Sequence, residues 1–166
     1  MDEPEPSQHE VRIRGVEEAD VEVFFEHQRD PVAILMADSS PRERDSFFTH
    51  WSEIRTGRTV VARTVVVDGD VAGNVLSWDW GQAGTREVGY WIGRAYWGRG
   101  VATRALALFL GQMTSRPLYA YVAAHNLGSI RVLEKCGFER TPAQDREPAT
   151  PGATTAVGEI ELVLTA

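Results

Sequence analysis

The chain has 166 residues, 43% of them hydrophobic and 25% charged, and its formal net charge at pH 7 is −7. This length and apolar content suit one compact domain, which we expect over residues 10–166 behind a Pro- and Glu-rich disordered tail, residues 1–9. The acidic balance argues against binding to nucleic acid or to an anionic membrane. Without a run of about 18 apolar residues or a basic signal peptide, we expect the protein to be cytoplasmic.

Cysteine and histidine usage gives no indication of a metal site. Cys136 is the single cysteine, so an internal disulfide cannot form. The four histidines, at positions 9, 27, 50 and 125, lack zinc-ligand spacing, and we expect no bound metal. Arginine outnumbers lysine sixteen to one, and a guanidinium is suited to bidentate contacts with phosphate.

The first third of the chain predicts a strand followed by two helices. Residues 11–14 alternate in polarity like a strand. Residues 17–27 place apolar side chains among acids as an amphipathic helix, and we expect Pro31 to follow its end. Pro41, which comes after two serines, is expected to open a second helix that closes near Gly57.

The middle of the chain predicts a β-hairpin and a further strand. Two runs rich in β-branched residues, 59–68 and 70–80, meet at an Asp-Gly dipeptide, which is the strongest short-range hairpin signal. A turn over residues 81–85 then leads into a strand over residues 87–92. The remaining expected elements are a helix over 100–113, a strand over 118–124, a short helix from 126 to 133 that stops at Gly137, a loop over 141–158 and a final strand over 159–165.

One long segment of the chain carries no carboxylate. The 46 residues between Glu87 and Glu134 contain five arginines and no acid, so a +5 segment lies within a chain of net charge −7. At its centre, residues 97–103 form a turn from strand to helix in which Gly98 and Gly100 leave the backbone bare. The amides at a helix N-terminus attract anions, so we expect this turn to hold a phosphate-bearing ligand.

Two common phosphate-binding signatures do not fit this turn. A P-loop requires Gly-x-x-x-x-Gly-Lys. Gly93 and Gly98 have the spacing of the two glycines, but Arg99 stands in the place of the lysine. A dinucleotide-binding turn requires a third glycine where Thr103 stands, and an acid about 20 residues later. After Thr103, the first acid in the chain is Glu134, about 30 residues later.

A third signature does fit. The run Gly-Arg-Gly-Val-Ala-Thr over residues 98–103 is followed by Asn126-x-x-Ser129 and by Leu-Glu-Lys-Cys-Gly-Phe over residues 133–138. Together these motifs resemble the GNAT superfamily of acetyl-CoA-dependent N-acetyltransferases. The last two motifs are most similar to the branch that contains the ribosomal-protein N-terminal acetyltransferases. The resemblance covers about residues 87–140 and implies a single GNAT-like acetyltransferase domain.

The resemblance implies an α/β fold of the α+β type, with a mixed, mostly antiparallel sheet of about six to seven strands and about four flanking helices. The sheet would splay between two central parallel strands, 87–92 and 118–124. Acetyl-CoA would lie in this split as the co-substrate, with its diphosphate on main-chain amides and no metal involved. Trp97 stands where the family has Gln or Arg. The cofactor-binding residues implied are Ile92, Trp97, Gly98, Arg99, Gly100, Val101, Ala102, Thr103 and Asn126.

Acetyl transfer also places demands on side chains. A lysine-like amine with a pKa of about 10.4 must lose a proton, which costs roughly 4.6 kcal/mol at pH 7, whereas an α-amine costs about 1 kcal/mol. Glu87 is our first candidate for the general base, acting directly or through water, and Asp79 is the second. A main-chain N–H near Ile92 would stabilise the oxyanion. Many family members protonate the leaving thiolate with a tyrosine at the position of Leu133, and here Ser129 is the replacement candidate.

Two functions remain open at this point. The first is an acetyltransferase whose partners are acetyl-CoA and a primary amine, either a protein N-terminus or a small molecule. The second is a non-catalytic acyl-CoA-binding sensor. A homodimer is the expected default for a small enzyme. The acceptor's walls are expected to come from the first two helices, the region of Asp79 and the loop over 141–158, none of which carries a recognisable motif.

Overall fold

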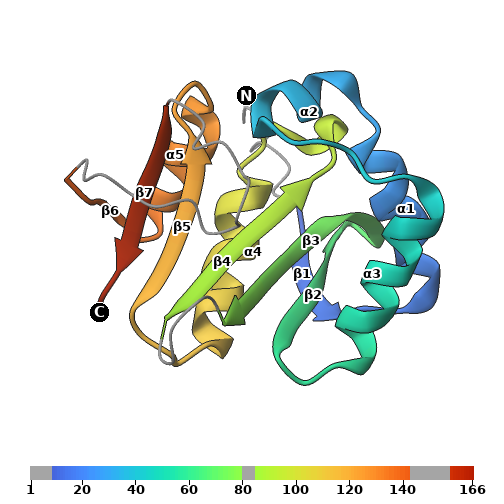
Figure 1. The fold of residues 1–166 in the computed structure, drawn as a ribbon. Helices are drawn as coiled ribbons and strands as arrows, with labels where there is room; N and C mark the ends of the chain where they lie inside the picture. Colours follow the sequence, from blue (N-terminus) through green and yellow to red (C-terminus); the bar gives the residue numbers. More distant parts are fainter. Residues whose placement is uncertain (1–8, 80–84, 143–157) are drawn as a thin grey trace, which may run out of the picture.

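The computed structural model describes residues 9–79, 85–142 and 158–166, and the structural statements that follow concern these residues. They form a seven-stranded mixed sheet with the strand order β1-β2-β3-β4-β5-β7-β6, and five α-helices pack against it (Figure 1). The fold class expected from the sequence is therefore confirmed. Within these residues, no helix is both long enough and apolar enough to cross a bilayer.

Each expected strand and helix is found near its predicted position. The strands are β1 (Val11–Gly15), β2 (Val60–Val67), β3 (Asp70–Asp79), β4 (Arg86–Ile92), β5 (Leu118–Ala123), β6 (Glu139–Arg140) and β7 (Glu159–Leu164). The helices are α1 (Glu18–Gln28), α2 (Pro31–Ala37), α3 (Arg44–Thr56), the 3₁₀-helix η1 (Arg94–Tyr96), α4 (Val101–Gln112) and α5 (Leu127–Lys135). The hairpin between β2 and β3 turns through Asp68 and Gly69, whose φ angles are both positive, 49° and 88°. Positive φ at both positions is what a tight two-residue hairpin requires.

The sheet divides between β4 and β5. Strands β3 and β4 pair antiparallel through seven residues each. Strands β4 and β5 run parallel, but their pairing is confined to Arg86 with Leu118 and Glu87 with Tyr119. From Val88 onward β4 has a neighbouring strand on one edge and a split on the other, as the fanning of the two strands in Figure 1 shows. The splayed pair of parallel strands expected from the sequence is present.

Two hydrophobic clusters, one on each face of the sheet, hold the helices. The larger cluster joins α4 and α5 to the sheet through buried residues that include Leu106, Phe109 and Leu133. The smaller cluster joins α1 and α3 to the opposite face, where the rings of Phe24 and Trp51 lie 4.8 Å apart between centroids. Because burying a large apolar side chain contributes roughly 1.5–3 kcal/mol, both sets of helices are firmly attached to the central strands.

Helix α2 was not predicted from the sequence. Pro31 follows the end of α1, as expected, and it is also the first residue of α2, where the Asp30 side chain accepts a hydrogen bond from the Val32 backbone N–H at 2.9 Å. Proline suits this position because the first helical N–H has no partner within the helix. Helix α3 begins at Arg44 rather than at Pro41, and the two-residue strand β6 was not expected. Four predictions fall wholly or partly outside the described residues. They concern the tail 1–9 that was expected to be disordered (save for its last residue), the end of the run 70–80, most of the turn 81–85 and most of the loop 141–158.

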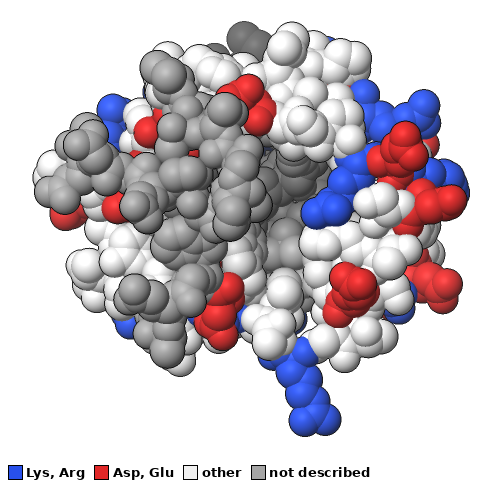
Figure 2. Space-filling model, in the orientation of Figure 1, with Lys and Arg blue, Asp and Glu red and all other residues white. Residues whose placement is uncertain are grey.

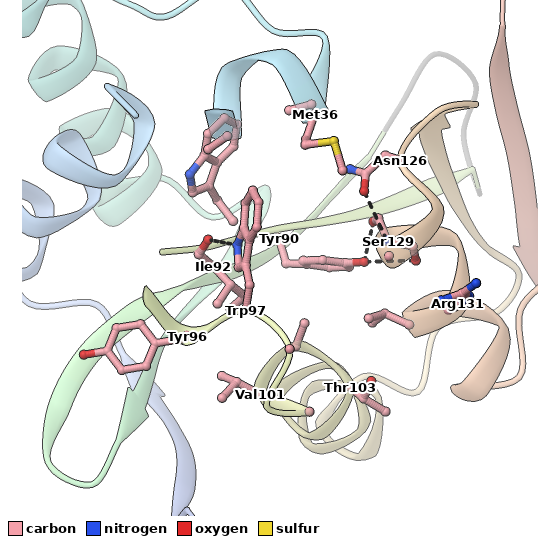
Figure 3. A pocket seen from close by; sticks show the side chains of 18 of the residues that line it. Met36, Tyr90, Ile92, Tyr96, Trp97, Val101, Thr103, Asn126, Ser129 and Arg131 are labelled. Carbon is pink, nitrogen blue, oxygen red and sulfur yellow. Dashed lines mark hydrogen bonds between the residues drawn. The ribbon is translucent and has the colours of Figure 1, made fainter. Parts of the chain in front are cut away.

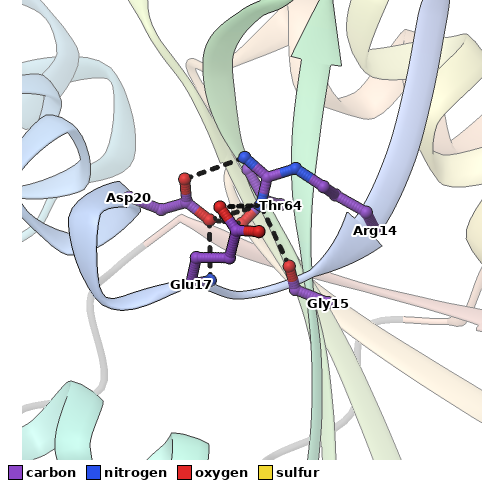
Figure 4. Close-up of polar contacts among 5 residues, drawn as sticks. All are labelled: Arg14, Gly15, Glu17, Asp20 and Thr64. Carbon is purple, nitrogen blue, oxygen red and sulfur yellow. Dashed lines mark hydrogen bonds and ion pairs between the residues drawn. The ribbon is translucent and has the colours of Figure 1, made fainter.

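A buried carboxylate ties helix α1 to the sheet (Figure 4). Asp20 is 2% exposed and accepts hydrogen bonds from the Arg14 guanidinium at 2.7 and 2.9 Å. Thr64 Oγ1 and the Glu17 backbone N–H donate to the same carboxylate at 2.7 and 2.8 Å. Burial by itself raises the pKa of Asp20, but the hydrogen bonds from these three groups outweigh it and hold the pKa below its ordinary value. Helix α1 is thereby fixed against β1 and β2.

We predict that Asp20→Asn lowers the free energy of unfolding at pH 7 by about 3 kcal/mol, because it leaves a buried set of donors without their anion. The contribution of Asp20 is fully present above the unfolded pKa of about 3.9 and is lost as the pH falls through the lower folded value. Urea denaturation from pH 7 to pH 3 should therefore show the difference from the wild type narrowing with acid. Glu22→Gln, which removes the exposed ion pair with Arg44, is the matched control and should change stability little. A difference that stayed constant down to pH 3 would contradict the charge-based account.

Candidate active site in the split of the sheet

A cavity of about 410 Å³ lies where β4 and β5 diverge, between the N-terminus of α4 and helices α2 and α5 (Figure 3). Its described lining residues are Ala33, Met36, Ala37, Tyr90, Trp91, Ile92, Tyr96, Trp97, Gly98, Gly100, Val101, Ala102, Thr103, Asn126, Gly128, Ser129, Arg131, Val132 and Lys135. None of these is acidic, and Arg131 and Lys135 are basic. The acid-free segment of the sequence therefore forms most of this wall, which favours an anionic ligand.

The N-terminus of α4 presents bare backbone amides to this cavity. Gly98 and Gly100 both have φ of 74°, and Gly100 is the N-cap. The first helical hydrogen bond joins the Arg104 N–H to the Gly100 carbonyl at 3.1 Å. The preceding amides of residues 101–103 have no acceptor within the helix, and the helix dipole gives this end a partial positive charge. This is the arrangement that binds phosphate groups in many proteins.

Trp97 and Ile92 close the end of β4. Trp97 is 39% exposed, and its Nε1–H donates to the Ile92 carbonyl at 2.8 Å. The Gly93 N–H donates to the Ala72 carbonyl on the β3 side at 2.8 Å. Because backbone groups alternate between the two edges of a strand, the N–H of Ile92 points to the other edge, toward the split. An oxyanion donor is available there. Arg99, which the sequence placed with the cofactor-binding residues, is exposed and does not line the cavity.

Asn126 and Ser129 lie on the far side of the cavity, at the start of α5. The Asn126 Oδ1 atom caps the helix by accepting from the Ser129 N–H at 3.2 Å. Ser129 Oγ lies 2.5 Å from the Tyr90 hydroxyl, whose ring extends from β4 toward it (Figure 3). Burial raises the pKa of Tyr90 to about 12, so this phenol stays protonated at neutral pH. Tyr90 was not singled out from the sequence, although alternation along residues 87–92 places it on the same face as Ile92.

Glu87 lies on the other face of β4. Strand alternation puts Glu87, Gly89 and Trp91 on one face, opposite Trp78, Leu76 and Asn74 of β3. Glu87 is half-buried and lines neither this cavity nor the second one described below. Asp79 does line the second cavity, and it is held by an ion pair with Arg86 at 2.8 Å. The two candidate bases therefore stand on the side of the second cavity rather than at the α4 end of the first.

A second cavity, of about 710 Å³, lies on the face covered by α1 and α3. Its described lining residues are Phe24, Gln28, Ser39, Ser40, Arg42, Phe47, His50, Trp51, Ile54, Thr59, Val60, Asn74, Leu76, Trp78, Asp79 and Trp91. Trp91 lines both cavities, so they are adjacent at the end of β4. Figure 2 shows that acidic and basic side chains are interspersed beside this region, over α1 and α3. The first two helices predicted from the sequence and Asp79, which were expected to form walls for the acceptor, line this one cavity, while most of the expected loop wall 141–158 lies outside the described residues.

Residues 10–139 match a family model described as an acetyltransferase (GNAT) domain. In fold, the chain is similar to a GNAT-family acetyltransferase from Bacillus anthracis, with 17% identity, a TM-score of 0.75 and coverage of 93% of this chain and 94% of that one. It is similar to the aminoglycoside acetyltransferase AAC(6')-Ib in complex with paromomycin and acetyl-CoA, with 17% identity, a TM-score of 0.73 and 93% of each chain. Mycobacterium smegmatis RimJ in complex with CoA-disulfide has 22% identity and a TM-score of 0.71, over 94% of this chain and 82% of that one. A comparison with curated protein sequences finds no match.

We predict that Gly100→Ala lowers the free energy of unfolding by about 1 kcal/mol, because a Cβ atom is strained in the left-handed conformation. Its Cβ would meet nothing closer than Arg104 at 3.8 Å, so the loss would come from the backbone and not from a clash. Gly111→Ala in the same helix α4 is the matched control, since its Cβ would stand in open space, and it should raise stability by about 0.5 kcal/mol. Equal effects of the two substitutions in urea denaturation would contradict the left-handed turn.

Proposed function

Because the chain belongs to the GNAT acetyltransferase family, we propose that it transfers an acetyl group from acetyl-CoA to a primary amine. One observation carries this proposal: the bare amides at the start of α4 open into an acid-free cavity that follows the unpaired edge of β4. Such a site is suited to a long anionic ligand with a thioester at its far end. The amine would reach the thioester from the second cavity, which meets the first at Trp91.

Donor binding would use the full length of the first cavity. The diphosphate of acetyl-CoA would accept hydrogen bonds from the amides of residues 101–103, and Arg131 and Lys135 would add positive charge. The pantetheine arm would run along β4, where Asn126 faces it from α5. The thioester carbonyl would then lie near the Ile92 N–H, the donor that would stabilise the oxyanion formed on attack.

In the transfer itself, the amine nitrogen attacks the thioester carbon, a C–N bond forms and the C–S bond breaks. The acceptor ammonium must first lose a proton, and we propose that Glu87 takes it through water. Four residue spacings of extended strand, about 13 Å, separate Glu87 from Trp91, so the proton would pass along a chain of water molecules and not by direct contact. Support for Glu87 comes from its position on the face of β4 that the acceptor cavity occupies. Asp79 is the alternative base, although its carboxylate already pairs with Arg86 at 2.8 Å.

The departing CoA thiolate would receive a proton from Ser129, assisted by Tyr90. A phenol is a stronger hydrogen-bond donor than an alcohol, so Tyr90 would donate to Ser129 Oγ across their 2.5 Å contact. The serine hydroxyl hydrogen would then be directed into the cavity, toward the sulfur. Tyr90 is on this account a positioning residue, and Ser129 is the group that touches the leaving atom.

We predict that acetyl-CoA raises the melting temperature and that adding a suitable primary amine releases free thiol. Glu87→Gln should lower kcat about a hundredfold and leave the melting-temperature increase unchanged, because it removes a base and no donor contact. Glu134→Gln, which removes an exposed carboxylate paired with Arg140, is the matched control and should retain wild-type kcat.

Three other outcomes are informative in this assay. Stabilisation by acetyl-CoA without thiol release from any amine would identify an acyl-CoA-binding sensor. Loss of stabilisation in Glu87→Gln would make Glu87 a structural residue. Absence of stabilisation in the wild type at millimolar acetyl-CoA would end the proposal.

We further predict that Ser129→Ala lowers kcat about tenfold with an unchanged KM for acetyl-CoA, and that Tyr90→Phe has a smaller effect in the same direction. Both effects should weaken when the pH rises above about 8.5, where a free thiol ionises without help. Ser115→Ala, at an exposed serine outside both cavities, serves as the control. A wild-type kcat for Ser129→Ala at neutral pH would show that the thiolate leaves without an acid.

A further inference from the structure

The second cavity indicates what kind of amine the protein accepts. We propose that the acceptor is a primary amine carrying one planar apolar group and no second positive charge. This inference rests on the proposed acetyl transfer, and it narrows the acceptor class from amines in general. It is carried by three features of the described lining: its aromatic walls, its lack of net charge and a buried polar pair at its inner end.

The walls of the second cavity are aromatic and rigid. Five aromatic side chains line it: Phe24 from α1, Phe47 and Trp51 from α3, Trp78 from β3 and Trp91 from β4. The first three are at most 6% exposed and pack against one another, with ring centroids 4.8 Å apart for Phe24 and Trp51 and 6.3 Å for Phe47 and Trp51. The half-buried rings of Trp78 and Trp91 offer the aromatic surface that a flat apolar group can contact, and ring-to-ring contacts would add to the area that is buried.

The described lining has no surplus of negative charge. Its formally charged members are Arg42 and Asp79, which cancel, and Asp79 already pairs with Arg86 at 2.8 Å. Burial and the nearby Arg42 lower the pKa of His50, while Glu53 acts in the opposite direction, so His50 is neutral at pH 7. Asp79 lies at the exposed edge of the cavity, so an ammonium group taken in among the aromatic side chains would lose its hydration at high cost. A polycation would lose it several times, whereas a monoamine is deprotonated when it reacts.

A polar pair marks the inner end of the cavity. Asn74 on β3 is 5% exposed and stands directly opposite Trp91 on β4, so their side chains are neighbours on one face. The Trp91 Nε1–H is buried, and no described residue accepts its hydrogen bond. Buried polar groups are normally satisfied, by protein or by a ligand. The Asn74 amide and the Trp91 indole therefore provide one acceptor and additional donors for the polar end of the substrate, where the two cavities meet.

The test compares amines of two kinds by thiol release from acetyl-CoA. Phenethylamine represents the aromatic monoamine, and spermidine and kanamycin represent polycations. We expect kcat/KM for phenethylamine to exceed both by about a hundredfold or more. Tetrapeptides beginning with Phe or with Lys separate the two sources of this chemistry. A preference for the Phe peptide over phenethylamine would assign the amine to a polypeptide N-terminus, and the reverse would assign it to a small molecule.

Two variants connect the preference to this cavity. Asn74→Leu should raise the KM for phenethylamine about tenfold and leave acetyl-CoA stabilisation unchanged, because its side chain lines only the acceptor side among the two cavities. Ser40→Asp adds a carboxylate at the exposed rim of the cavity. It should lower the ratio of kcat/KM for phenethylamine to that for spermidine about fivefold, whereas Ser40→Asn should leave this ratio unchanged.

Each result bears on one proposal or the other. Better turnover of spermidine or kanamycin than of phenethylamine would overturn the acceptor class and leave acetyl transfer intact. Wild-type acceptor kinetics in both Asn74→Leu and Ser40→Asp would show that this cavity does not hold the amine. Acetyl-CoA stabilisation with no thiol release from any compound would overturn the inference together with catalysis, and absence of that stabilisation would overturn the proposed function itself.

Discussion

The unpaired edge of β4 is the constraint on which the rest of the site depends. A central strand normally satisfies its backbone groups on both sides, but β4 has pairing to β5 at its first two residues alone. On the unpaired edge, the Trp97 indole N–H donates a hydrogen bond to one backbone carbonyl, that of Ile92. The amides of β4 that point to the split, like those at the start of α4, are left for a ligand or for solvent. A chain that closed the sheet would be more regular and would have no groove.

The cavities on the two faces of the sheet differ in the charge and in the type of the side chains that line them. On the α4 and α5 side, the described lining of the first cavity contains Arg131 and Lys135 and no acid. On the α1 and α3 side, the lining of the second cavity is aromatic, and the two formal charges among its described residues cancel. The Asp20 cluster secures helix α1, which supplies Phe24 to that second wall. The ion pair of Asp20 with Arg14 thus supports the shape of the adjacent cavity, since α1 carries both Asp20 and Phe24.

Local chemistry explains which features could be read from the sequence. Two turns could be predicted from the sequence because only particular residues adopt positive φ easily. They are the turn with Gly98 and Gly100 and the Asp-Gly hairpin. Helix α2 was not anticipated, although Asp30 before Pro31 is a valid helix start, because the same proline also suits a helix end. Tyr90 and the aromatic cavity could not be recognised locally. Their partners come from positions far apart in the chain, such as Ser129 for Tyr90, and sequence periodicity carries no information about which faces meet.

Trp91 belongs to the walls of both cavities, and this position has a kinetic consequence. A donor in the first cavity and an acceptor in the second would lie next to the same side chain, so both could be bound at once. The proposed transfer would then pass through a ternary complex, in which the acyl group moves once between two bound molecules. No acylated form of the protein would be required.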